Sequence, residues 1–125
     1  MFQSTINIVN MNNMTIIIDE SLSIKNTIHI KYCHNLIIKN TSNNNKINKI
    51  IIEKCNNITI NFQNSLSLVN GIEINKSNKI IIISEKSTSI PLIELFKSTL
   101  YIIGSIDSYK DIKINSELSE LYNIE

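Results

Sequence analysis

The sequence predicts an all-β fold, a right-handed parallel β-helix of five to six coils with a repeat of about 22 residues. Two observations predict it. The stretches IHIKYCHNLII (28–38) and IIIEKCNNITI (50–60) lie 22 residues apart, with cysteine over cysteine. Within each stretch apolar and polar residues alternate, which is typical of a β-strand. One such unit cannot bury its apolar side chains alone, so neighbouring units must stack.

Five units are in register, beginning near residues 6, 28, 50, 72 and 93. An isoleucine-rich composition by itself would scatter isoleucine evenly, whereas here it gathers at fixed positions of the unit. Isoleucine is a strong strand former, and its branched side chain stacks well on a copy of itself. Positions within a unit are counted from its first isoleucine, which is position 0, and residues that share a position form a column. The columns expected to point inward are Ile6, Ile28, Ile50, Ile72 and Ile93 at position 0; Ile8, Ile30, Ile52, Ile74 and Leu95 at +2; Met14, Leu36, Ile58, Ile80 and Tyr101 at +8; and Ile16, Ile38, Ile60, Ile82 and Ile103 at +10.

The residues between the two alternating segments of a unit are expected to form a corner. The chain has only two glycines and one proline, so asparagine, serine and lysine must turn the corners. Asparagine tolerates the left-handed conformation that such turns need. The +5 column, expected to point inward, is Met11, Cys33, Cys55, Ser77 and Ser98, and the +4 column is Asn10, Tyr32, Lys54, Lys76 and Lys97.

A further apolar pair in most units predicts a third side of each coil. The pairs are Leu22 and Ile24, Leu66 and Leu68, and Thr88 and Ile90. The polar stretch NTSNNNKIN (40–48) is expected to bulge as a loop from the second coil.

The whole chain, 1–125, is expected to be one β-helix domain, with 105–125 as a C-terminal tail or cap. Within SELSELYNIE (116–125), Leu118, Leu121 and Tyr122 follow Ser116 at helical spacing. A helix with Ser116 as N-cap and an extended tail therefore both stay open.

Composition excludes several classes of function. The net charge is +1 and the basic residues are scattered, so nucleic acid is not an expected partner. The longest apolar run covers only 80–83, which excludes a membrane-spanning helix. The sequence shows no pattern typical of a signal peptide, and its two cysteines are therefore expected in a reducing compartment, which favours a cytoplasmic protein.

No catalytic constellation, cofactor motif or metal site is expected. Cys33, His34 and Cys55 invite a metal interpretation, but the inward position of both cysteines favours core packing. A disulfide between them is sterically conceivable and is disfavoured in the cytoplasm. His29 and His34 have no carboxylate nearby in the sequence, so a solvated surface is favoured over acid–base catalysis.

The lysines of the +4 column are the most informative polar residues. Lys54, Lys76 and Lys97 should stack one coil apart, where like charges repel unless carboxylates or a partner offset them. Glu53 and Asn75 share position +3, and Glu73 and Glu94 share position +1. The column is either a solvated face or a docking surface for a protein.

Residues 72–103 resemble the C-terminal domain of cyclase-associated protein, a family of actin-monomer regulators. INSELSELYN (114–123) is similar to a degraded form of the family's Val-Pro-Glu-Gln-Phe-Lys-Thr stretch, and 28–38 and 50–60 are similar to its cysteine-centred coils. The resemblance is carried by Ile72, Ile74, Asn75, Lys76, Ser77, Lys86, Ile93, Lys97 and Ser98.

This resemblance implies a non-enzymatic domain that binds monomeric actin and promotes exchange of ADP for ATP. The family usually dimerises through an exchanged C-terminal strand. Here the sequence ends at Glu125, so that strand is expected to be missing, which leaves a homodimer open. The residues expected to contact the partner are Lys54, Asn75, Lys76, Lys86, Lys97 and Ser98.

Parallel β-helices also serve two other functions that bear on this sequence. SIPLIE (89–94) resembles a stretch of the tubulin-cofactor C proteins, some of which activate a GTPase. That activity needs an arginine supplied in trans, and this chain has none, so only a binding module remains as the alternative. A polysaccharide-acting β-helix enzyme would need clustered carboxylates, whereas the acidic residues here are spread singly.

Overall fold

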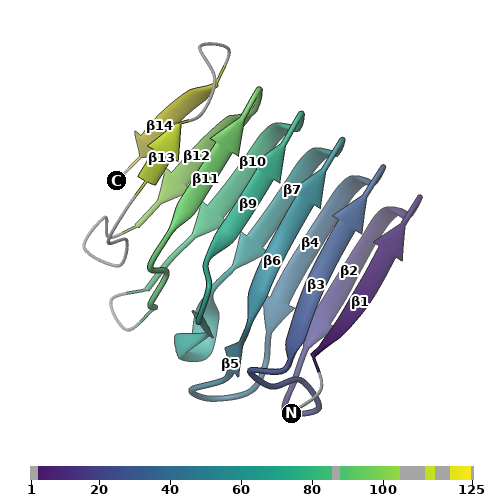
Figure 1. Cartoon of the computed structure of the whole chain (residues 1–125), viewed down its shortest axis with the longest axis vertical. Coiled ribbons are helices and arrows are strands. Elements are labelled where there is room, and N and C mark those ends of the chain that lie inside the picture. The colour runs from purple at the N-terminus through teal and green to yellow at the C-terminus, as the bar shows by residue number, and fades with distance from the viewer. Residues whose placement is uncertain (1–2, 86–87, 105–111, 115–118, 125) are drawn as a thin grey trace.

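The computed structural model describes residues 3–85, 88–104, 112–114 and 119–124. The chain forms a parallel β-solenoid with a repeat of about 22 residues, as predicted. Two six-stranded sheets run along the stack of coils, one behind the other in the view of Figure 1. The first sheet is β1 (Ser4–Val9), β3 (Asn26–Lys31), β6 (Lys49–Glu53), β9 (Ile72–Asn75), β11 (Ile93–Phe96) and β13 (Ile112–Ile114). The second sheet is β2 (Asn12–Ile18), β4 (His34–Asn40), β7 (Asn56–Asn61), β10 (Asn78–Ile83), β12 (Thr99–Ile103) and β14 (Glu120–Ile124).

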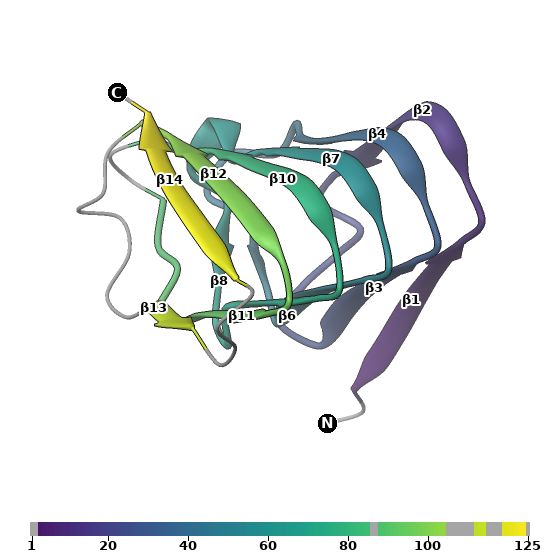
Figure 2. The ribbon, with the colours of Figure 1, turned by 90° about the horizontal axis from the view of Figure 1, so that it is seen from above.

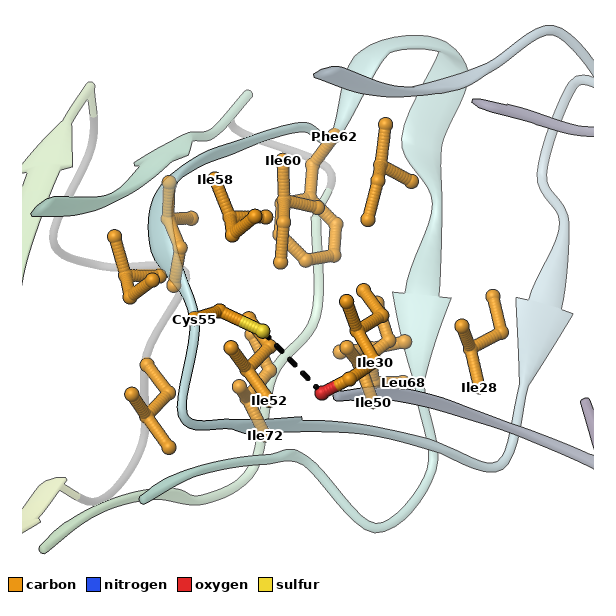
Figure 3. Close-up of a cluster of buried hydrophobic side chains, with 14 of the residues drawn as sticks. Ile28, Ile30, Ile50, Ile52, Cys55, Ile58, Ile60, Phe62, Leu68 and Ile72 are labelled. Atoms are coloured by element: carbon orange, nitrogen blue, oxygen red, sulfur yellow. Dashed lines mark hydrogen bonds between the residues drawn. The ribbon is translucent and has the colours of Figure 1, made fainter. Parts of the chain in front are cut away.

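The core is a set of isoleucine ladders between the two sheets. Figure 2 shows the two sheets as opposite layers of the stacked coils, joined at one corner. In the parallel register Ile28 pairs with Ile50 and Ile50 with Ile72, so like residues stack. Figure 3 shows these side chains packed against those of the second sheet, such as Ile58 and Ile60. Each fully buried isoleucine contributes about 1.5–3 kcal/mol, so the ladders are the main source of stability.

The fifth coil departs from the predicted columns. Leu100 and Ile102 are fully buried, whereas Tyr101 and Ile103 point outward. The reason is that the corner between β11 and β12 is one residue shorter than the corner between β9 and β10 in the coil before it. Ile72 pairs with Ile93, 21 residues on, but Ile80 pairs with Leu100, only 20 residues on. The predicted inward positions of Tyr101 and Ile103 were therefore wrong.

The first coil is less buried than its sequence pattern predicts. Met11, Met14 and Ile24 are 41%, 43% and 44% exposed. β1 and β2 are the terminal strands of their sheets, so one side of this coil faces away from the stack. The predicted inward columns hold in the second, third and fourth coils, where a neighbouring coil lies on each side.

The third side is short and begins at the second coil. β5 (Lys46–Ile47) pairs with β8 (Ser67–Leu68), which follows the short 3-10 helix η1 (Gln63–Ser65). The predicted loop 40–48 is therefore only partly a bulge. Asn40 and Asn45 are buried within it, and the Asn45 Nδ2 donates a hydrogen bond to the carbonyl oxygen of Asp19 at 2.9 Å.

The C-terminal segment adds a sixth coil. β13 pairs with β11, and β14 pairs with β12. Residues 120–124 are thus extended rather than helical, while Ser116 and Leu118 lie outside the described residues. Over the described part of the chain, no helix is long and apolar enough to cross a membrane.

Candidate functional site

The candidate site lies at the corner that joins the two sheets. All five residues of the +4 column adopt the left-handed conformation, with φ between 48° and 56°. This conformation costs a residue with a side chain about 1–2 kcal/mol. Hydrogen bonds between coils hold it in place: the Lys54 N–H donates to the Asn75 carbonyl at 3.0 Å and the Lys76 N–H to the Phe96 carbonyl at 2.8 Å. The corner is therefore a fixed backbone frame that carries exposed side chains.

The +5 column forms the inner lining of this corner. The Cys55 N–H donates a hydrogen bond to Ser77 Oγ, and the Ser77 N–H donates to Ser98 Oγ, both at 3.0 Å. Ser98 is only 1% exposed. Its expected role in partner contact was therefore wrong, because its side chain is enclosed in the corner and occupied by the backbone.

A second left-handed column turns the chain into the second sheet. It consists of Asn13, Asn35, Asn57 and Lys79, with φ between 56° and 60°. The Asn57 amide donates to Asn35 Oδ1 at 2.7 Å, and the Asn35 amide donates to Asn13 Oδ1 at 2.9 Å. This asparagine ladder was not singled out from the sequence. The recurrence of asparagine seven residues after the first three unit starts was the signal for it.

Aromatic rings, rather than carboxylates, lie against two of the three column lysines. Lys54 Nζ lies 5.4 Å from the centre of the Tyr32 ring, and Lys97 Nζ lies 5.4 Å from the centre of the Phe96 ring. Such cation–π contacts at exposed sites contribute about 0.5–1 kcal/mol. Among the described residues no ion pair is recorded for Lys54, Lys76 or Lys97. The column therefore presents positive charge to solvent.

The carboxylates next to the corner are engaged within the first sheet. Glu73 Oε1 lies 3.4 Å from Lys49 Nζ, and Glu73 Oε2 accepts a hydrogen bond from the Asn75 amide at 3.1 Å. His29 Nε2 lies 3.8 Å from Glu53 Oε1. No carboxylate lies near His29 in the sequence, and it is the stacking of coils that brings Glu53 to it from the next coil.

A depression of ≈ 400 Å³ lies beside the column. It brings together three expected contact residues, Lys54, Asn75 and Lys76, with Glu53 and Phe96. Sequence reasoning missed Phe96 as a site residue, although an aromatic side chain at the outward +3 position was a visible signal.

The other expected contact residues lie elsewhere. Lys97 is exposed one residue beyond Phe96 and does not line the depression. Lys86 lies outside the described residues.

The chemistry of the corner suits recognition of a protein surface. It offers lysine ammonium groups, an amide and an exposed aromatic ring, which match carboxylates beside an apolar side chain. Cys33 and Cys55 are free and buried, as expected, and burial raises the pKa of the Cys55 thiol. Over the described residues no three His, Cys, Asp or Glu side chains gather as metal ligands would.

Comparison with known proteins gives a similarity of fold. No protein-family model and no curated protein matches the sequence. The solved structure of the cyclase-associated protein from Cryptosporidium parvum is similar, with a TM-score of 0.63 and 24% sequence identity. The match covers 96% of this chain and 65% of that chain, so this chain spans just under two thirds of that protein's solved length.

Proposed function

We propose that this domain binds monomeric actin in the cytoplasm and promotes exchange of its ADP for ATP, and so supports turnover of the actin cytoskeleton. The observation that carries the proposal is the exposed lysine column beside the depression at the corner. Two observations support the choice of partner. The resemblance of residues 72–103 and the fold similarity both lead to cyclase-associated protein.

The domain itself performs no chemistry in this proposal. Lysines along the corner meet carboxylates on the partner, which increases the association rate and fixes the orientation more than it raises affinity. Exchange is accelerated if the domain binds actin with an open nucleotide cleft more tightly than closed ADP-actin, because a ligand shifts an equilibrium only by its differential affinity.

The proposal is tested by the release of a fluorescent nucleotide from ADP-actin with and without the domain. Acceleration that is lost in Lys76→Ala and kept in Lys25→Ala is the expected result. Lys25 is an exposed lysine outside the corner and serves as the matched control. A parallel pull-down with tubulin distinguishes actin binding from the alternative, a binding module similar to tubulin-cofactor C. Capture of tubulin without actin would replace actin as the partner.

A further inference from the structure

The outer face of the second sheet is unusually apolar for an exposed surface. Ile17, Ile37 and Ile103 are 49%, 42% and 36% exposed on it, and Tyr122 is 43% exposed. The faces of parallel sheets are normally covered by other elements. The outward apolar residues of β2, β4, β10, β12 and β14 define what we call the apolar face: Ile17, Ile37, Ile81, Ile83, Tyr101, Ile103 and Tyr122. The outward residues of β7, which lies between β4 and β10, are the polar Thr59 and Asn61, so most of the face lies over β10, β12 and β14.

The apolar face has a hollow near its C-terminal end. A depression of ≈ 270 Å³ is lined by Asn57, Lys79, Ile81, Tyr101 and Ile103. The Tyr101 ring, which forms one wall, stacks on the Tyr122 ring at 5.0 Å between centroids and 15° between planes. Small-molecule pockets usually measure about 300–1,000 Å³. This depression is smaller and suits one large apolar side chain of a protein partner.

Charge on this face is positive. Lys39 lies on it among the exposed isoleucines, and Lys79 lines its hollow. The carboxylate of Glu120, on the edge strand β14, is hydrogen-bonded by the Tyr122 hydroxyl. A partner therefore gains by placing carboxylates beside its apolar side chains.

The size of the face decides which occupant fits. Six strands of about six residues, spaced about 4.8 Å apart, span roughly 500 Å² in projection. A stable dimer buries about 800 Å² per partner, so this face is too small to hold a second copy of the chain in a stable dimer. An extended segment packed on the exposed isoleucines would leave backbone N–H and C=O groups without hydrogen-bond partners, whereas a helix forms these hydrogen bonds within itself. A helix of about 12 residues is about 18 Å long and about 10 Å wide, so it covers the hollow and the apolar residues around it rather than the whole sheet.

We propose that the apolar face docks an amphipathic helix of a partner protein. The apolar stripe of that helix packs on the exposed isoleucines and places one large side chain in the hollow beside Tyr101. Carboxylates on its flanks lie next to Lys39 and Lys79. This site is separate from the lysine column, and its test contains no actin.

The probe is a stapled 14-residue helical peptide with leucines at i, i+3, i+4 and i+7 and glutamates on both flanks, followed by fluorescence anisotropy. We expect saturable binding that Ile103→Lys weakens at least tenfold. The matched control is Val69→Lys, a 49% exposed valine outside the apolar face, which should leave binding unchanged. A peptide with lysines in place of the glutamates should bind at least fivefold more weakly.

Three outcomes would overturn the proposal. One is the absence of binding up to millimolar peptide. Another is equal loss of binding in Ile103→Lys and Val69→Lys. The third is a dimer in sedimentation that Ile103→Lys dissociates, which would assign the face to a second copy of this chain.

Discussion

The backbone N–H of Ser77 donates a hydrogen bond to the Oγ of Ser98, 3.0 Å away in the next coil. Cys33 plays the same part earlier in the stack, where its Sγ accepts from the Met11 N–H at 3.4 Å. Cysteine and serine both occur in this column because each is small enough for the corner and can accept this hydrogen bond. The column joins successive coils through their backbones and leaves the lysines beside it exposed.

Removing the acceptor at Ser98 is expected to destabilise the fold. Ser98→Ala leaves the buried N–H of Ser77 without a partner, which costs about 1–3 kcal/mol. Urea denaturation followed by circular dichroism measures this loss. Ser98→Cys restores an acceptor and should recover most of the stability. Equal stability of all three proteins would contradict the role given to this column.

Placing a charge at Cys55 is expected to be far more damaging. Cys55→Asp buries an unpaired carboxylate among the isoleucine ladders, and a cost of several kcal/mol is expected. Cys55→Ser reproduces the side chain found at Ser77 and should be tolerated. Thermal melting of both variants gives the comparison, and an unchanged melting temperature for the aspartate variant would refute the inward position of Cys55.

The raised pKa of the Cys55 thiol predicts a dependence of stability on pH. Burial disfavours the thiolate in the folded protein, so this contribution to stability is complete below the unfolded pKa of about 8.5 and is lost as pH rises above it. The urea midpoint should therefore fall between pH 7 and pH 9.5. Cys55→Ser should show a smaller fall, and an identical fall in both proteins would exclude Cys55 as its source.

Most of the fold could be predicted from the sequence because stacking makes the repeat visible. Each unit places the same residue types at the same depth, so the columns through Ile28, Ile50 and Ile72 could be aligned without a structure. The shortened corner before Leu100 could not be located, since a column counted from Ile93 also meets an apolar residue at Tyr101.

The site was less predictable than the fold. The lysine column followed from the repeat, but contacts between coils depend on side-chain direction. The pairing of His29 with Glu53 and the placement of Phe96 beside Lys76 are contacts of that kind. The contact role of Ser98 came from the family resemblance, whereas its +5 position predicted the inward side chain that the structure shows.

The left-handed backbone at Lys76 predicts an unusual gain from glycine. Its φ of 48° strains a lysine, and Lys76→Gly relieves that strain while increasing the freedom of the unfolded chain. A net gain of up to about 1 kcal/mol in unfolding free energy is expected. Lys31→Gly, within β3, is the control and should cost about 0.5–1 kcal/mol. Destabilisation of similar size at both positions would rule out strain at the corner.

The most direct test of the proposed function is the affinity of the domain for monomeric ADP-actin, measured by anisotropy of a labelled domain. The double variant Lys76→Ala and Lys97→Ala removes two charges of the corner column without touching the buried +5 residues. We expect it to bind at least tenfold more weakly than the wild type while it stays folded, with only the small fall in melting temperature that loss of the Lys97–Phe96 contact causes, while Lys25→Ala binds normally. Equal affinity of the double variant and the wild type would contradict the assignment of the corner as the actin contact, and no measurable binding by the wild type would contradict actin as the partner.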